Sequence, residues 1–248
     1  MVNILTLKWG TLYGPHYVNR LYAGVKKNLN RPFRFVCFTD DPTGLDPRVD
    51  VQPLPELNLG RMQNTTWIKL ALFQTGLANL SGTCLFLDLD LLITENMDCF
   101  FDFMPGKRCI TQNWVQAHQR LIKKRPDVGN SSVVRFDSGT TQFIVDKFIS
   151  ERDWAYENFH PAQVYLTYAL GEKYYFPDQW VASFKRHCVP TFPLNLVLEP
   201  KMRPKAKMVV FHGNPNPDVA IEGNLKARLH RRTKPAPWVE QYWQAESA

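Results

Sequence analysis

The stretch that decides the fold is Cys84-Leu85-Phe86-Leu87-Asp88-Leu89-Asp90-Leu91-Leu92-Ile93. Apart from two aspartates it is wholly apolar, which indicates a central strand buried on both faces. An ionised carboxylate in such a place costs several kcal/mol unless a partner or a metal compensates it. Asp88 and Asp90 are two residues apart, so a regular strand points both to the same face.

We therefore expect a divalent cation beside Asp88 and Asp90, at the carboxyl end of the strand, where open α/β sheets bind their ligands. Carboxylate oxygens are the ligands that Mg²⁺ and Mn²⁺ prefer. The alternative is that the two acids cap a loop or pair with arginine or lysine.

Working outward, the apolar pattern alternates between strands and helices. The predicted elements are a strand over 2–7, a helix over 17–29, a strand over 34–39, a loop over 42–64, a helix over 65–80 capped by Thr65 or Thr66, a strand over 132–136, a helix over 142–149, another from 161, and a strand over 207–211. A helix between two consecutive strands implies a parallel pair. We expect an α/β fold, with a mixed, mostly parallel central sheet flanked by helices, over residues 1–217.

The remaining residues, 218–248, form a basic and aromatic C-terminal extension. The net charge of the chain is +7, and residues 201–248 hold nine Lys or Arg against four Asp or Glu. Such an end suits an anionic membrane or an acidic acceptor, or it is simply a solvated surface. The chain contains no sequence-reading nucleic-acid motif, so we expect no nucleic-acid partner.

Cysteine usage and hydropathy bear on the compartment. The five cysteines are odd in number and show no Cys-x-x-Cys spacing, which argues against a disulfide framework and a zinc ribbon. The first residues do not follow a signal-peptide pattern, and no apolar run is long enough to cross a bilayer. We expect a cytoplasmic protein, with contact to the inner face of the membrane left open.

Five segments, in order along the chain, resemble nucleotide-sugar glycosyltransferases of the GT-A fold, in particular the retaining family-eight type and related bacterial enzymes. Residues 84–93 resemble their Asp-x-Asp strand. The others are residues 5–10 with Tyr13 and Tyr17, residues 35–41, residues 129–134 and residues 210–217, the last being similar to a His-x-Gly-x-x-Lys-Pro motif.

The resemblance implies that Asp90 and His212 bind Mn²⁺ or Mg²⁺ directly, and that Asp88 binds the metal or holds the ribose. Asn216 falls where the motif has a lysine that meets the diphosphate. The expected donor contacts are Thr6, Lys8, Tyr13, Lys69, Asp88, Asn130, Ser131, Gly213 and Asn216. For Tyr13 and Tyr17, stacking on a nucleotide base and packing of the first helix are both open. Lys69 is equally explained as a solvated helix lysine.

The sequence offers more than one candidate for the catalytic group. The family-eight likeness implies retention of the anomeric configuration. Gln163 matches the position that faces the donor sugar, and Asp178 is a rival. An inverting enzyme would require a carboxylate base, for which Asp137 or Asp178 would be the candidates.

The sequence thus predicts a hexosyl transfer from a nucleotide-diphosphate sugar, with UDP favoured, to a glycan or glycolipid acceptor such as a surface polysaccharide. A nucleotidyltransferase would show a basic, glycine-rich loop after the first strand, and residues 9–16 contain no Arg or Lys. A non-catalytic carbohydrate- or polyanion-binding protein on a degenerate transferase fold is the alternative.

Overall fold

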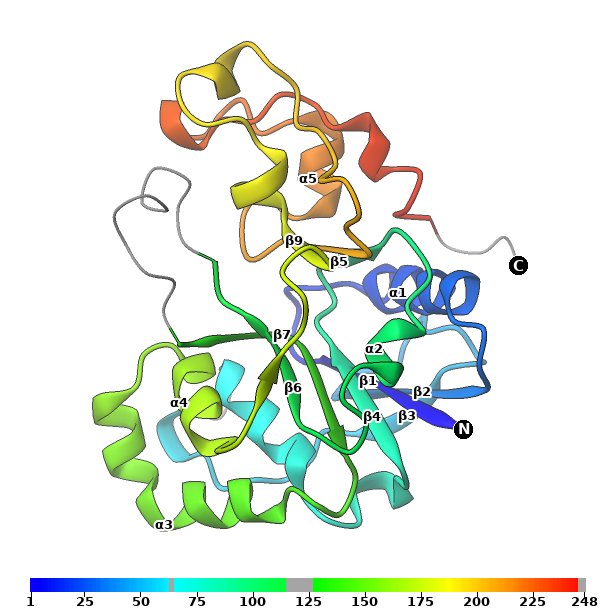
Figure 1. The fold of residues 1–248 in the computed structure, drawn as a ribbon, viewed down its shortest axis with the longest axis vertical. Coiled ribbons are helices and arrows are strands. Elements are labelled where there is room, and N and C mark those ends of the chain that lie inside the picture. The colour runs from blue at the N-terminus through cyan, green and yellow to red at the C-terminus, as the bar shows by residue number, and fades with distance from the viewer. Residues whose placement is uncertain (63–64, 115–126, 245–248) are drawn as a thin grey trace.

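The computed structural model describes residues 1–62, 65–114 and 127–244 and is built on a seven-stranded sheet (Figure 1). The strand order is β3-β2-β1-β4-β7-β6-β8, and four of the six neighbouring pairs are parallel. The strands are β1 (Val2–Lys8), β2 (Phe33–Thr39), β3 (Asp50–Pro53), β4 (Thr83–Leu87), β6 (Cys109–Gln112), β7 (Gly129–Asp137) and β8 (Tyr174–Tyr175). The predicted mixed, mostly parallel sheet is confirmed.

Both faces of this sheet are buried, each against its own hydrophobic core. Successive residues of β1 alternate between the cores: Ile4 joins one, and Leu5 and Leu7 join the other. The first core contains α1 (Pro15–Asn28). The second contains the 3-10 helix η2 (Thr66–Phe73), α3 (Gln142–Asn158) and α4 (Ala162–Ala169). This double burial explains why the strand sequences are so continuously apolar.

The predicted single strand over residues 84–93 is in fact two strands in two different sheets. β4 ends at Leu87, and β5 (Leu91–Ile93) belongs to a three-stranded sheet with β10 (Met208–Val210) and β9 (Val181–Ser183). Asp88 and Asp90 lie in the crossing between the sheets. The amide of Asp88 donates to the Ser132 carbonyl at 3.0 Å, and the Asp90 carbonyl accepts from the Phe211 amide at 2.8 Å.

This crossing corrects the argument that a regular strand orients both carboxylates. Their place is set by backbone bonds to two other strands. The same bonds bring the residues that precede Ser132 and follow Phe211 to the aspartates.

Two other expectations about local structure were incomplete. The loop over residues 42–64 contains the edge strand β3 and the 3-10 turn η1 (Gly60–Met62), which the polar and proline-rich composition concealed. The helix over residues 65–80 is η2 followed by a second 3-10 turn, η3 (Leu77–Asn79). The cap prediction holds, because the Thr65 hydroxyl accepts from the Trp67 amide at 3.4 Å.

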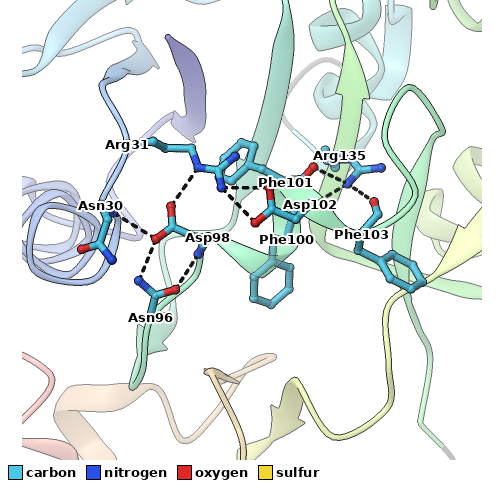
Figure 2. Close-up of polar contacts among 9 residues, drawn as sticks. All are labelled: Asn30, Arg31, Asn96, Asp98, Phe100, Phe101, Asp102, Phe103 and Arg135. Atoms are coloured by element: carbon cyan, nitrogen blue, oxygen red, sulfur yellow. Dashed lines mark hydrogen bonds and ion pairs between the residues drawn. The ribbon is translucent and has the colours of Figure 1, made fainter.

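Arg135 on β7 is a fully buried cation that holds together the turn after α2 (Cys99–Asp102) (Figure 2). Its guanidinium donates to backbone carbonyls, including those of Phe100 at 2.7 Å and Lys107 at 3.0 Å. Beside it, Arg31 joins the segment before β2 to the two ends of α2 through Asp98 and Asp102, at 2.8 and 2.9 Å. Arg135 therefore serves the fold, because carbonyl dipoles compensate its charge.

The last part of the chain packs on the first helix (Figure 1). It contains the π-helical turn η5 (Phe184–Cys188), η6 (Leu194–Leu196), α5 (Pro217–Glu222), η7 (Leu229–Arg231) and η8 (Pro237–Val239). Asp218 accepts from Arg20 of α1 and from the Trp243 indole, both at 2.7 Å. Trp243 is 2% exposed and belongs to the same core as α1. Residues 218–244 are thus packed on the N-terminal part of the chain, and residues 245–248 lie outside the described residues.

Within the described part of the chain, none of the helices is both long and apolar enough to span a membrane.

Candidate active site

A cavity of about 720 Å³ opens where β4 leaves the main sheet. It is lined by the loop after β1, by η2, by the Asp88–Asp90 crossing, by the start of β7 and of α4, and by the residues after β10. Nine of the predicted site residues line it: Tyr13, Lys69, Asp88, Asp90, Asn130, Ser131, Gln163, His212 and Gly213. The cavity therefore lies at the carboxyl end of the central strand, where the sequence analysis expects the site.

Asp90 is the most buried carboxylate of the cavity wall, at 6% exposed. Its Oδ2 accepts a hydrogen bond from the Tyr13 hydroxyl at 3.0 Å. Burial, and then the charge of Asp88, raise the pKa of Asp90 to about 7. Burial and the contact with Asp90 also raise the pKa of Tyr13, so Tyr13 stays a hydrogen-bond donor. Asp90 is held in place but not neutralised by this neighbour.

Asp88 has a different partner. Its Oδ1 lies 2.6 Å from Lys69 Nζ, and both side chains are largely buried. Lys69 also donates to Ser131 Oγ at 3.2 Å. The lysine predicted as a donor contact or a solvated helix residue is therefore a buried ion-pair partner that ties η2 to β7. Together these contacts fix one wall of the cavity.

His212 follows β10 and reaches the cavity from the smaller sheet. Its Nε2 and Ser183 Oγ share a hydrogen bond at 2.6 Å, and its ring stacks on Trp114 with centroids 5.4 Å apart. Burial, and then the charges of Lys185 and Arg186, lower the pKa of His212 to about 4. The imidazole is therefore neutral at pH 7, the form that binds metals.

The side-chain types at the site are suitable ligands for a divalent cation: they are Asp88, Asp90 and His212. Two carboxylates and a neutral imidazole suit Mn²⁺ or Mg²⁺, and Asp90 has no ion pair with a described Lys or Arg. Across residues 1–62, 65–114 and 127–244, however, no three or more His, Cys, Asp or Glu side chains are gathered as a metal cluster. The three residues share one cavity, with Asp88 turned to Lys69 and His212 to Ser183.

Gln163 is placed in the cavity by the first turn of α4. Asn130 Nδ2 donates to its Oε1 at 3.4 Å, while its backbone carbonyl accepts from Thr167 Oγ1 at 2.6 Å. The same Thr167 hydroxyl accepts from the Gly129 amide at 2.8 Å. This chain of bonds clamps α4 on the start of β7. A side-chain amide that donates and accepts hydrogen bonds is thus presented to the cavity.

Two predicted donor contacts on β1 lie inside the protein and do not line the cavity. Thr6 Oγ1 donates to the Leu87 carbonyl at 2.9 Å, which ties β1 to the end of β4. Lys8 is 4% exposed, and its Nζ donates to the Asp41 carbonyl at 3.2 Å. Both side chains are engaged by the sheet and its edge, so neither is assigned to the donor.

Three more candidates are also placed elsewhere. Asn216 Oδ1 accepts from the Val219 amide at 3.3 Å and caps α5. Asp178 pairs with Arg203 at 2.8 Å, and Asp137 accepts from Thr83 at the opposite end of β4, at 2.7 Å. Each makes a structural contact away from the cavity lining, which leaves Gln163 as the candidate that faces a donor sugar.

The sequence indicated no individual role in the site for several residues found there. Trp9, Thr11 and Pro161 line the cavity. Ser183, which the sequence offered only as part of an acceptor surface with Trp180 and Lys185, supports His212. Ser183 reaches His212 because β9 pairs with β10 in parallel, with Val210 beside Ser183. That pairing joins segments far apart in the chain, and no local pattern signals it.

No protein-family model matches the sequence, and no curated protein matches it. Among solved structures, the galactosyltransferase LgtC in complex with donor and acceptor sugar analogues matches at a TM-score of 0.55, with 13% identity over 87% of this chain and 89% of that one. A second LgtC structure, an active-site mutant with a glutamine replaced by glutamate, matches at a TM-score of 0.59, with 12% identity over 97% and 94%.

The glycosyltransferase GlyE of Streptococcus pneumoniae TIGR4 matches at a TM-score of 0.61, with 11% identity over 88% of this chain and 56% of that one. The chain therefore has the GT-A fold of these glycosyltransferases, as predicted. Identities this low establish a fold, so the function is argued from the cavity itself.

Proposed function

We propose that the chain is a metal-dependent glycosyltransferase that moves a hexosyl group from a nucleotide-diphosphate sugar, with UDP favoured, to a glycan or glycolipid acceptor, with retention. The observation that carries the proposal is the convergence of Asp90, His212 and Gln163 on one cavity of about 720 Å³. A cavity of this size suits a ligand as large as a nucleotide sugar.

The charges on the cavity wall indicate that a diphosphate would need a bound cation. Among the described lining residues, the charged groups are the carboxylates of Asp88 and Asp90 and the ammonium of Lys69. A nucleotide diphosphate brings further negative charge, so the wall alone would repel it. Asp90 and His212 would hold Mn²⁺ or Mg²⁺, with Asp88 as a third ligand or a ribose contact. The bound metal would neutralise the departing diphosphate.

The residues opposite the aspartates would orient the donor sugar. Asn130, Ser131 and Gln163 line the cavity and offer amide and hydroxyl groups, which suit sugar hydroxyls. The LgtC mutant carries a glutamine-to-glutamate change in its active site. A glutamine in that active site favours Gln163 as the residue beside the donor sugar here. Asp88 and Asp90 are the only carboxylates in the described lining. With Asp90 on the metal and Asp88 on the metal or the ribose, none is left as an inverting base, which favours retention.

The loop after β1 would bind the nucleotide base. Tyr13 and Trp9 line the cavity there, and aromatic faces stack on bases. Tyr17 is 3% exposed and packs on Tyr13 and Trp243, so it belongs to the core. In this arrangement Tyr13 both contacts the nucleotide and fixes Asp90 through its hydroxyl.

Residues 192–232, in the last part of the chain, would contact the membrane that holds a glycolipid acceptor. Six large apolar side chains are at least half exposed there: Phe192, Leu194, Val197, Leu198, Leu225 and Leu229. Asn195 donates to the carbonyls of Leu229 and Arg232, which joins residues 192–198 to residues 225–232. Basic residues lie near them in the sequence, including Lys201, Lys226 and Arg228. Apolar groups together with positive charge suit an anionic lipid surface.

Sedimentation with phosphatidylcholine vesicles, with and without phosphatidylglycerol, tests this contact. We expect binding that needs the anionic lipid and weakens in a Val197→Ser/Leu198→Ser variant. Equal recovery in the supernatant with both vesicles would refute it.

Donor turnover tests the function. Purified protein is incubated with a panel of nucleotide sugars and either Mn²⁺ or Mg²⁺, and release of the nucleotide is followed by chromatography. We expect one donor to be consumed only with metal, and turnover to stop on chelation and in Asp90→Ala. Asp153→Asn, which removes an aspartate that is 84% exposed, should behave as the wild type. Sugar binding without turnover of any donor would favour the non-catalytic alternative.

A further inference from the structure

A group of basic side chains beside the cavity has no anionic partner in the described structure. Lys185 and Arg186 lie on η5, directly after β9, and Arg231 lies on η7. None of the three forms an ion pair with a described carboxylate, although six arginines and five lysines of the described residues do. Lys185 and Arg186 are both only partly exposed. Clustered and partly buried cations repel one another and lose hydration, so this arrangement is unfavourable unless an anion joins it.

Lys185 contacts two residues of the cavity wall. Its Nζ donates to the His212 carbonyl at 2.7 Å. It also lies 3.6 Å from the point that a Cβ on Gly213 would occupy. His212 and Gly213 both line the cavity. The ammonium therefore sits directly behind the part of the wall formed by these two residues, and two of its three protons have no described acceptor.

The backbone that carries Lys185 is well fixed. Phe184 is fully buried and stacks on Phe211 with centroids 4.4 Å apart. The Ser183 hydroxyl accepts from the Arg186 amide at 3.2 Å, which caps the turn. A rigid turn with a flexible four-carbon side chain allows the ammonium to reach toward the cavity without moving the backbone.

The electrostatic neighbourhood favours an anion at this point. Burial, and then the charges of Arg186 and Arg231, lower the pKa of Lys185, while Asp90 opposes them. Gly213 has a φ of +74° and no side chain, so no Cβ stands between its backbone and the Lys185 ammonium. Asn216, four residues after His212, is used as the cap of α5 and brings no charge.

We propose that the Lys185 ammonium, in the field of Arg186 and Arg231, binds the diphosphate of the nucleotide donor. This inference rests on the proposed function and assigns the phosphate contact to a residue outside the motif that follows β10. Because the contact is made with a charged ligand group, it adds to the metal in offsetting the diphosphate charge.

Calorimetry with Lys185→Met and Lys185→Arg tests the proposal, using UDP with Mn²⁺ as the probe and ADP and GDP in parallel. Lys185→Met removes a charge-assisted hydrogen bond to the diphosphate and should weaken UDP binding roughly tenfold or more. Lys185→Arg should keep the affinity within about threefold, because the charge remains. Lys201→Gln, which removes an exposed lysine, is the matched control and should bind as the wild type.

Uridine, titrated by NMR, separates a phosphate contact from a structural role. Lys185→Met should bind uridine as the wild type does and should melt at the same temperature. Two results for Lys185→Met would overturn this inference: uridine and UDP binding weakened to the same extent, or an unchanged affinity for UDP. In either case, UDP binding by the wild type would still support the proposed function. If the wild type bound none of the three nucleotides, the proposed function would fall and this inference with it.

Discussion

Replacing Asp90 by asparagine should stabilise the protein at neutral and alkaline pH when no divalent cation is present. Asp90 is 6% exposed and has the Tyr13 hydroxyl, not a cation, as its close partner. Burial, and then the charge of Asp88, raise its pKa from 3.8 to about 7. Asparagine keeps the shape and still accepts from Tyr13, but it carries no charge to bury.

The size of the effect follows from proton linkage. A raised pKa in the folded state means that the stability contributed by Asp90 is fully present below pH 3.8 and is lost as the pH rises to about 7. Each pH unit in that window costs the wild type about 1.4 kcal/mol. The advantage of Asp90→Asn should therefore grow by about 2 kcal/mol between pH 5 and 7, and level off near 4 kcal/mol above it.

Urea denaturation of both proteins from pH 5 to 8.5, in the presence of a chelator, measures this difference. Asp153→Asn serves as the control, since an aspartate that is 84% exposed should show no such trend. Adding Mn²⁺ should then reverse the order, because only the wild type keeps the carboxylate ligand. A difference that stays constant with pH, or a variant less stable than the wild type at pH 8, would refute the reasoning.

Further predictions concern the fold and the site. Arg135→Met should destabilise the protein by about 3 kcal/mol or more in urea, because it leaves several buried carbonyls unpaired. Trp243→Ala should cost about 3–5 kcal/mol, since the indole is 2% exposed and bonded to Asp218. Gly129→Ala should lower the melting temperature, since an added Cβ collides with Ile110. His212→Gln should weaken metal-dependent nucleotide binding at least about tenfold in calorimetry while leaving Mn²⁺-free stability nearly unchanged; a normal affinity would remove His212 from the metal set.

Local patterns were sufficient for the first three elements of the chain. The strand over 2–7, the helix over 17–29 and the strand over 34–39 correspond to β1, α1 and β2, because each has a clear apolar period and a clear end. The anomaly of Asp88 and Asp90 also located the cavity correctly, since charges are rarely left in an apolar stretch without a use.

The sequence could not predict which strands pair with one another when they lie far apart in the chain. Residues 84–93 are as apolar as one strand would be, and nothing in their composition reveals that β4 and β5 belong to different sheets. Thr6 and Lys8 are polar residues near a strand end, yet their partners are the Leu87 and Asp41 carbonyls. Ser183 and Lys185 reach His212 only through the pairing of β9 with β10. Contacts between segments so far apart in the chain cannot be seen in either segment alone.

Calorimetry of the wild type and Asp90→Ala against a panel of nucleoside diphosphates, with and without Mn²⁺, tests the central claim most directly. The proposed site predicts that one nucleotide binds the wild type only with metal, and that Asp90→Ala abolishes this binding. Absence of binding to the wild type with either Mn²⁺ or Mg²⁺, for every nucleotide, would contradict the assignment of this cavity to a nucleotide-sugar donor.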